Sequence, residues 1–500
     1  MVKCMYSLRA SFRQSAKTPS LLCFVVLLSA AASSGQAISL TATGGPPTTK
    51  TSVSGSGFSA KSAVDIFFDT TDELLIITDG TGAFPKTTLQ VPASAVPGKH
   101  FVSAVQRSTG TGAQVAFTVH TNWAQQGFSS THQGWNPYEN VLNTSNVGSL
   151  DLLWSMNNFG FGVQSALSVF GNDIYFGGNN DHVFATNAGT GALIWDTATQ
   201  NGVTATPALG GGQVCVGSGD DNIYLLNASS GTVSHSFATG GIIVGSSAIA
   251  NGLCYFGSGD NNVYAMFLSD GFIPWVNITG GPIYSSPAVS NGVVFISSTD
   301  GYLYALNASN GAFLWKSFTG DNQGASPIVA NGMVFLPSSN EGQLFAFYAK
   351  SGTPAWSLPV NIIYDYEPEL AVANSVLYFF SSNDLYAVQT GTGNYRWAIN
   401  LGSDTCLEPS VANGIVYLGD CFSGLVYAID AASGNILWEY AMANGGVGAP
   451  AVVNGVVYTA DRSGNLYAFG LPSSPAATAP ALPALRSLRA DLTLKPYKTQ

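Results

Sequence analysis

The sequence predicts an all-β protein in which a β-sandwich of the immunoglobulin-like class is followed by an eight-bladed β-propeller. Tryptophans recur at a spacing of 40 or 41 residues through the second half of the chain, and Asn-Gly turn signals recur in phase with them. The 57 glycines and 23 prolines favour many tight turns. A repeat of this length with strand and turn composition is typical of propeller blades. Only 9% of the residues are charged, which suits an exported β-protein better than a cytosolic helical one.

Residues 1–37 read as a signal peptide, because a basic stretch precedes the apolar run at residues 21–28 and small residues lead to Ala37, after which we expect cleavage. The apolar run is too short for a permanent transmembrane helix, and no other stretch could cross a membrane. Cys23 follows Leu22 rather than a small residue, so no lipid anchor is expected. We therefore predict an exported protein, periplasmic or extracellular. Its net charge of −11 disfavours nucleic acid as a partner.

Residues 38–120 contain about seven short β-rich runs separated by turn clusters, which predicts a β-sandwich. The run at residues 52–58 (Ser-Val-Ser-Gly-Ser-Gly-Phe) resembles the opening of IPT/TIG-type immunoglobulin-like domains. Residues 121–150 form a linker that nevertheless holds Trp123, Trp135 and Tyr138. Aromatic residues are scarce in flexible linkers, so we expect this linker to pack against the propeller.

Residues 151–470 form the predicted propeller, and one repeat shows how a blade is built. Pro287–Val289 is the inner strand, an Asn-Gly turn follows, and residues 293–296 return. A second turn leads to residues 302–306, and Phe313–Trp315 is the outer strand. The last repeat lacks its outer strand, and residues 152–154 supply it, which closes a ring of eight blades. The Pro/Ala-rich residues 471–500 are expected to be disordered.

The pattern Ala-x-Asn/Asp-x-x-Thr/Ser-Gly-x-x-x-Trp resembles the tryptophan-docking motif of quinoprotein-like (PQQ-repeat) propellers, with its clearest copy at residues 428–438. In that family each tryptophan packs between blades against small residues. The resemblance assigns structural docking to the following tryptophans and glycines: Trp154, Trp195, Trp275, Trp315, Trp356, Trp397, Trp438, Gly191, Gly271, Gly311, Gly352, Gly393 and Gly434. In the second blade His235 replaces the tryptophan and Leu225 replaces the alanine.

The resemblance implies one of two functions. PQQ-dependent dehydrogenases of this family use a vicinal Cys-Cys disulfide, a stacking tryptophan and Ca²⁺ ligands, whereas BamB-like members are non-catalytic binding propellers. This sequence has no adjacent cysteines, and docking accounts for every propeller tryptophan. We therefore predict a monomeric, non-catalytic scaffold that recognises a protein partner through one propeller face, with no cofactor. The alternatives are an alcohol or sugar dehydrogenase with an atypical PQQ and Ca²⁺ site, and a carbohydrate-binding adhesion module.

Two neighbouring blades place a glutamate, Glu367 and Glu408, just before the inner strand, with Asp365 and Asp404 close in sequence. Clustered carboxylates at the mouth of the channel could bind Ca²⁺ or a basic partner segment; the alternative is that they are solvated. Acids also recur between the second and third strands of four blades, where Asp is a common turn residue: Asp220, Asp260, Asp300 and Asp461.

Four cysteines lie beyond the signal peptide. Cys406 begins the first strand of a blade and Cys421 ends its second strand, so antiparallel pairing predicts a structural disulfide between them. Cys215 and Cys254 are one register apart in neighbouring blades, so their side chains should face opposite ways and remain free thiols. His132 and His182 have no partner in the sequence, and we assign neither a role.

Overall fold

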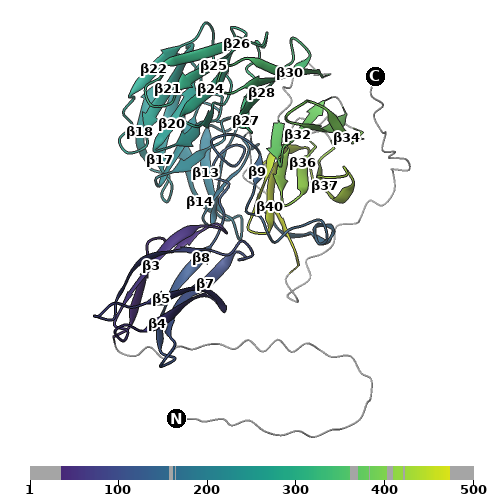
Figure 1. Ribbon diagram of the computed structural model, residues 1–500. Coiled ribbons are helices and arrows are strands. Elements are labelled where there is room, and N and C mark those ends of the chain that lie inside the picture. Colours follow the sequence, from purple (N-terminus) through teal and green to yellow (C-terminus); the bar gives the residue numbers. More distant parts are fainter. Residues whose placement is uncertain are drawn as a thin grey trace, which may run out of the picture. The chain divides into compact units, whose positions relative to one another are not determined.

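The computed structural model describes residues 35–156, 162–163, 165–360, 370–381, 383–402, 409–420 and 423–472 (Figure 1). Apart from one 3₁₀ turn, η1 (Val147–Ser149), the regular structure of these residues is β-strand, and the predicted all-β propeller fold is confirmed. In this part of the chain no helix has the length and hydropathy that a membrane crossing needs. The chain divides into two compact units, and each is described by itself.

The N-terminal strands form a three-stranded sheet, in the order β1-β3-β6, and a five-stranded sheet, in the order β2-β8-β7-β4-β5. Val64, Ile66 and Phe68 alternate along β4 and are all buried, as expected for a strand with one face on a core. The immunoglobulin-like class of this region stays a prediction. The strands are β1 (Ala37–Leu40), β2 (Gly44–Gly45), β3 (Lys50–Ser56), β4 (Ala63–Phe68), β5 (Thr71–Ile77), β6 (Phe84–Gln90), β7 (Gly98–Gln106) and β8 (Gly112–Val119).

The propeller residues that the structure describes form eight sheets, which we number as blades 1 to 8. Blades 1 to 4 each consist of four consecutive antiparallel strands, from the inner to the outer edge. They are β11 (Ser168–Phe170), β12 (Asp173–Gly177), β13 (His182–Asn187) and β14 (Leu193–Ala198); β15 (Ala208–Gly210), β16 (Gln213–Gly217), β17 (Asn222–Asn227) and β18 (Val233–Ala238); β19 (Ala248–Ala250), β20 (Leu253–Gly257), β21 (Asn262–Phe267) and β22 (Trp275–Ile278); β23 (Ala288–Ser290), β24 (Val293–Ser298), β25 (Tyr302–Asn307) and β26 (Phe313–Phe318).

Blades 5 to 7 follow the same plan, and blade 7 carries an additional short strand, β9 (Trp135–Asn136), which pairs in parallel with its inner strand. Their strands are β27 (Ile328–Ala330), β28 (Met333–Ser338), β29 (Gln343–Tyr348) and β30 (Pro354–Pro359); β31 (Leu370–Ala373), β32 (Val376–Ser381), β33 (Asp384–Gln389) and β34 (Tyr395–Asn400); β35 (Ser410–Ala412), β36 (Ile415–Gly419), β37 (Leu425–Asp430) and β38 (Ile436–Ala441).

Blade 8 joins the two ends of the propeller. Its first three strands are β39 (Gly446–Val453), β40 (Val456–Asp461) and β41 (Leu466–Gly470), and its outer strand is β10 (Asp151–Met156). β10 pairs antiparallel with β41, with Asp151 opposite Gly470 and Ser155 opposite Tyr467. The strand before the first repeat therefore completes the last blade, so that the two ends of the propeller pair within one sheet.

The hydrophobic core lies between neighbouring blades. One buried cluster combines Tyr255 and Trp275 of blade 3 with Val294 and Ile296 of blade 4. Because both faces of a blade are covered, the second and third strands of blades 3 and 4 are nearly continuous buried runs rather than alternating ones. Asn291 and Gly292, which join β23 to β24, both have positive φ (49° and 76°), as a two-residue type I′ hairpin turn requires.

Candidate binding surfaces

The seven docking tryptophans each join two neighbouring blades. Each indole Nε1–H donates to a backbone carbonyl oxygen of the next blade, or of the segment that leads into β10, at 2.8 to 3.1 Å. The pairs are Trp154 with Ala188, Trp195 with Ala228, Trp275 with Ala308, Trp315 with Ala349, Trp356 with Thr390, Trp397 with Ala431, and Trp438 with Leu150.

The docking glycines lie against the indole rings of the preceding blade. Gly311 has φ of 69°, and a Cβ added there would lie 2.6 Å from Cε3 of Trp275, so both the backbone conformation and the close contact require glycine. Five further glycines contact an indole in the same way, and Gly271 contacts His235 instead. The five are Gly191, Gly231, Gly352, Gly393 and Gly434.

The linker before the propeller is a belt around its axis, which we define as residues 123–136. The inner strand of each blade is an edge, and the N–H of its middle residue points away from the second strand. In seven blades this N–H donates to an oxygen atom of the belt: Val169 to Trp123, Leu209 to Ala124, Ile249 to Gln125, Val289 to Ser130, Val329 to Thr131, Val372 to Gln133 and Val411 to Gly134.

The belt reaches the eighth blade through Asn136, whose Nδ2 donates to the carbonyl oxygen of Val452 at 2.8 Å. A single segment thus bonds to an equivalent residue of all eight inner strands. Aromatic rings pack together within this segment: between ring centroids, Phe128 lies 5.3 Å from Trp123 and 6.4 Å from Tyr138, which follows the belt. Sequence reasoning expected this linker to pack on the propeller but offered no signal for its path.

His132 lies within the belt and is 2% exposed. Neither of its ring nitrogens has a hydrogen-bond partner among the described residues, and burial lowers the pKa of its imidazole to about 4. The protonated ring would be a buried, unpaired charge, so the neutral form is the one that the folded belt accommodates.

We expect acid to weaken the folded state through His132. Because its pKa is lowered on folding, the unfolded chain binds the proton first, and stability is lost as the pH falls from about 6.5 to about 4, by roughly 3 kcal/mol. His132→Asn removes the titration and tolerates the positive φ of 54°. Urea unfolding at pH 7 and pH 4.5 should show a smaller acid loss for this variant than for the wild type. His182→Gln, at a partly exposed histidine bonded to Asp196, should keep the full loss.

The recurring aspartates serve as turn and bridging residues. Oδ1 of Asp260 accepts from the N–H of Asn262, while Oδ2 accepts from the hydroxyl of Tyr264 and from the N–H of Gly240, in the segment that leads out of blade 2. Burial by itself would raise the pKa of Asp260, but these hydrogen bonds hold it below its ordinary value. Asp220 and Asp300 bond in the same way, and Asp461 bonds to Asn465 and Tyr467.

The predicted carboxylate cluster, Asp365, Glu367, Asp404 and Glu408, lies outside the described residues, as do Cys406 and Cys421. Cation binding at the channel mouth and the disulfide between these two cysteines therefore stay predictions. Within the described ranges, no three His, Cys, Asp or Glu side chains are grouped closely enough to hold a metal ion.

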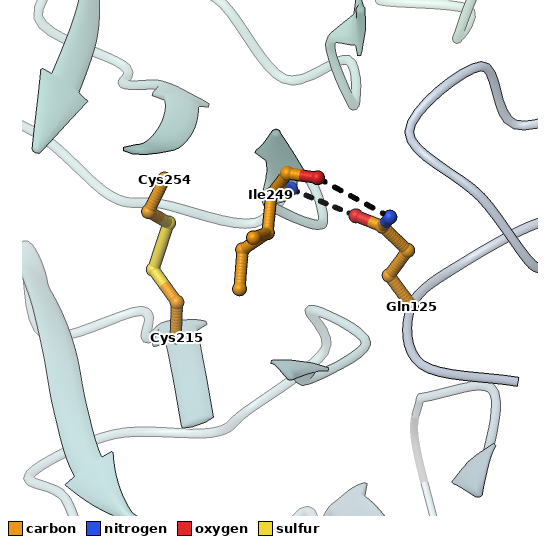
Figure 2. Close-up of a disulfide and its surroundings, with 4 residues drawn as sticks. All are labelled: Gln125, Cys215, Ile249 and Cys254. Atoms are coloured by element: carbon orange, nitrogen blue, oxygen red, sulfur yellow. Dashed lines mark hydrogen bonds between the residues drawn. A yellow bond between two sulfur atoms is a disulfide. The ribbon is translucent and has the colours of Figure 1, made fainter. Parts of the chain in front are cut away.

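The expectation that Cys215 and Cys254 are free is wrong, because they form a disulfide (Figure 2). Their Cα atoms are 6.7 Å apart, and both side chains are fully buried. The two residues do point to opposite faces of their own sheets. Successive blades turn opposite faces toward each other, however, so side chains of opposite parity meet in the space between them. The prediction compared the two residues as if they belonged to one sheet.

An exposed apolar surface follows the outer strands of blades 1 to 4. We call it the apolar rim and define it by the following large side chains, each at least 44% exposed: Leu193, Ile194, Val233, Phe272, Val276, Ile278, Phe313, Leu314 and Phe318. The outer strands of blades 5 to 7, as far as the structure describes them, expose no large apolar side chain to this degree. Among these strands β18 and β22 contain no Asp, Glu, Lys, Arg or Pro, the residues that commonly protect an edge strand from pairing.

A family model described as outer membrane protein assembly factor BamB matches residues 144–282, 275–407 and 381–471, which together make up more than half of the chain. No curated protein sequence matches the chain.

Solved structures share the fold at low sequence identity. A quinohemoprotein alcohol dehydrogenase from Comamonas testosteroni has a TM-score of 0.62 at 16% identity over 74% of this chain and 83% of its own. BamB from Moraxella catarrhalis has a TM-score of 0.55 at 16% identity, over 64% of this chain and 99% of its own. The computationally designed Ika8 protein has a TM-score of 0.56 at 14% identity, over 64% and 99%. An enzyme, an assembly factor and a designed protein thus share this fold, so the fold alone does not decide the function.

Proposed function

Because this chain belongs to the family described as outer membrane protein assembly factor BamB, we propose that it is an exported, non-catalytic scaffold that binds a protein partner. The apolar rim is the observation that carries the proposal. It brings large exposed apolar side chains to four successive blades, and concentrations of exposed apolar surface commonly mark protein–protein interaction sites.

The use of the aromatic residues supports the same proposal. Of the nine tryptophans in the chain, seven dock one blade on the next, Trp123 is buried in the belt, and Trp135 packs against the core of blades 6 and 7. All nine indole rings thus have a structural role within the propeller. Recognition then falls to the outer edge of the blades, where Phe272, just before β22, and Phe318 of β26 are each 62% exposed. Sequence reasoning placed the binding surface on one propeller face, whereas the exposed apolar side chains favour the outer edge.

The partner that best fits the rim presents an apolar, extended segment. Phe and Ile side chains supply apolar contact area, and the unprotected backbone edges of β18 and β22 offer N–H and C=O groups for strand addition. The rim also carries few charges: Asp196 is bonded to His182, and Nζ of Lys316 lies 4.0 Å from the ring centroid of Tyr302. Such a surface selects partners by shape and apolar area rather than by charge.

Replacing Phe272 and Phe318 together by serine should weaken capture of the partner about ten-fold or more, since one lost aromatic anchor commonly costs about 1–2 kcal/mol. The measurement is affinity capture from an envelope extract with the immobilised full chain, followed by titration of the captured protein. Ile77→Ser removes a side chain that is 60% exposed in the N-terminal unit and should leave capture unchanged.

Two outcomes would overturn the proposal. If Ile77→Ser abolishes capture while the rim variant retains it, the N-terminal unit is the binding module, and glycan binding becomes the next assay. If the protein reduces a dye acceptor in the presence of PQQ, Ca²⁺ and an alcohol or sugar, the chain is an enzyme rather than a scaffold.

A further inference from the structure

Neighbouring blades are held together by a repeated pair of aromatic residues. In blade 3 the Trp275 ring packs against Tyr255 at 6.0 Å between centroids, and both Trp275 Nε1 and the Tyr255 hydroxyl donate to the carbonyl oxygen of Ala308 in blade 4. Blades 1 and 6 repeat this arrangement with Tyr175 and Tyr378. In blades 4 and 5 a phenylalanine takes the place of the tyrosine.

The interface between blades 2 and 3 lacks this pair. His235, which is exposed, stands at the tryptophan position, and Cys215 stands where the other blades have Tyr or Phe. Cys254, on the facing side of blade 3, occupies the position held by Val214 and Val294 in the neighbouring blades. Cys215 and Cys254 therefore both depart from the repeat at the same interface, and a disulfide joins them.

The belt also holds blade 3 differently. Blades 1 and 2 receive backbone oxygens of the belt, whereas Ile249 of blade 3 is bonded by the side chain of Gln125, whose Oε1 accepts from the Ile249 N–H at 2.8 Å (Figure 2). The Gln125 Nε2 donates back to the Ile249 carbonyl oxygen at 3.4 Å. A side-chain contact is lost more easily than a backbone one, because it can rotate away. Blade 3 therefore has a side-chain contact to the belt, and its interface with blade 2 has a disulfide in place of the aromatic pair.

We infer that the Cys215–Cys254 disulfide is a redox-controlled lock on the interface between blades 2 and 3. Oxidised, it takes the place of the missing tryptophan contact and keeps the ring closed. Both cysteines are fully buried, so a dithiol reductant reaches the S–S bond when this interface opens transiently; its thiolate then attacks one sulfur, and its second thiol resolves the mixed disulfide. Two electrons and two protons pass to the cysteines, which become thiols, while the reductant becomes a disulfide. Cys215 and Cys254 are then two small, unbonded side chains at the one interface without a docked indole, and the ring opens there first.

We call the interface between blades 2 and 3 the seam. The test compares amide hydrogen exchange of the oxidised and the dithiothreitol-reduced full chain. Both carry Cys406→Ser and Cys421→Ser, so that only the Cys215–Cys254 disulfide changes on reduction. Peptides covering β16 to β21 should exchange at least ten-fold faster after reduction. Peptides covering β28 and β29 of blade 5 serve as the internal reference and should change little. Equal exchange at the seam in both states, or an increase shared by all blades, would overturn the inference.

A repaired interface provides the matched variant. Cys215→Tyr, Cys254→Val, His235→Trp and Leu225→Ala together restore the residue types that the repeat has elsewhere. This protein should show slow exchange at the seam with or without dithiothreitol. If its seam exchanges as fast as that of the reduced protein, the disulfide does not stand in for the tryptophan contact. Should the variant fail to fold, the comparison of the two redox states still decides the question, because it involves no change at the seam.

Discussion

Trp275→Ala is expected to lower the free energy of unfolding by about 3–5 kcal/mol. Trp275 is 7% exposed, and its indole fills the space between Tyr255 and the backbone of Gly311. Alanine leaves a cavity there and removes the hydrogen bond to Ala308. Gly311, which faces the indole, has no side chain that could move into the gap. Urea unfolding followed by circular dichroism measures the loss.

Phe272→Ala is the matched control, three positions earlier in the chain. Phe272 is 62% exposed, so its removal should change stability by no more than about 0.5 kcal/mol. A loss for Trp275→Ala as small as that for Phe272→Ala would contradict the role of the indole as the wedge between blades.

Removing the disulfide with Cys215→Ala and Cys254→Val is expected to cost about 4 kcal/mol. The bridge closes a loop with a sequence separation of 39 residues, and the chain-entropy model gives about this value for a loop of that length. Alanine and valine keep the site apolar, so no unpaired polar group is introduced. Thermal unfolding of the variant and of the oxidised wild type gives the comparison.

His235→Ala provides the control at the same interface. The imidazole is exposed, so its loss should cost less than about 1 kcal/mol. If the cysteine variant loses as little as His235→Ala does, the covalent bond does not hold this interface.

The repeat could be predicted from sequence because its physical requirements recur in fixed places. A docked indole needs a glycine on the next blade, as Gly311 illustrates, and a two-residue turn needs residues that tolerate positive φ, as Asn291 and Gly292 do. The pairing of β10 with β41 likewise follows from counting strands, since the last repeat is one strand short.

The belt and the disulfide could not be predicted in the same way. Belt residues such as Ala124 and Thr131 bond through their backbone oxygens, which every residue type supplies, so no side-chain pattern marks their path. The disulfide depends on which faces of two different sheets meet, whereas side-chain parity along one strand describes only a single sheet. The lowered pKa of His132 results from its burial, and the neighbouring residues in the sequence do not reveal that this side chain is buried.

Amide hydrogen exchange of the inner strands of blades 1 to 7 tests the closed, belted ring most directly. The amides of Val169, Val289 and Val411 point away from their own blades and are bonded only by the belt. Peptides that cover the inner strands of blades 1 to 7, where the belt accepts the N–H of the middle residue, should exchange slowly, at rates close to those of the second strands. Exchange of several inner strands at the rate of an unstructured peptide would show that no belt joins the blades.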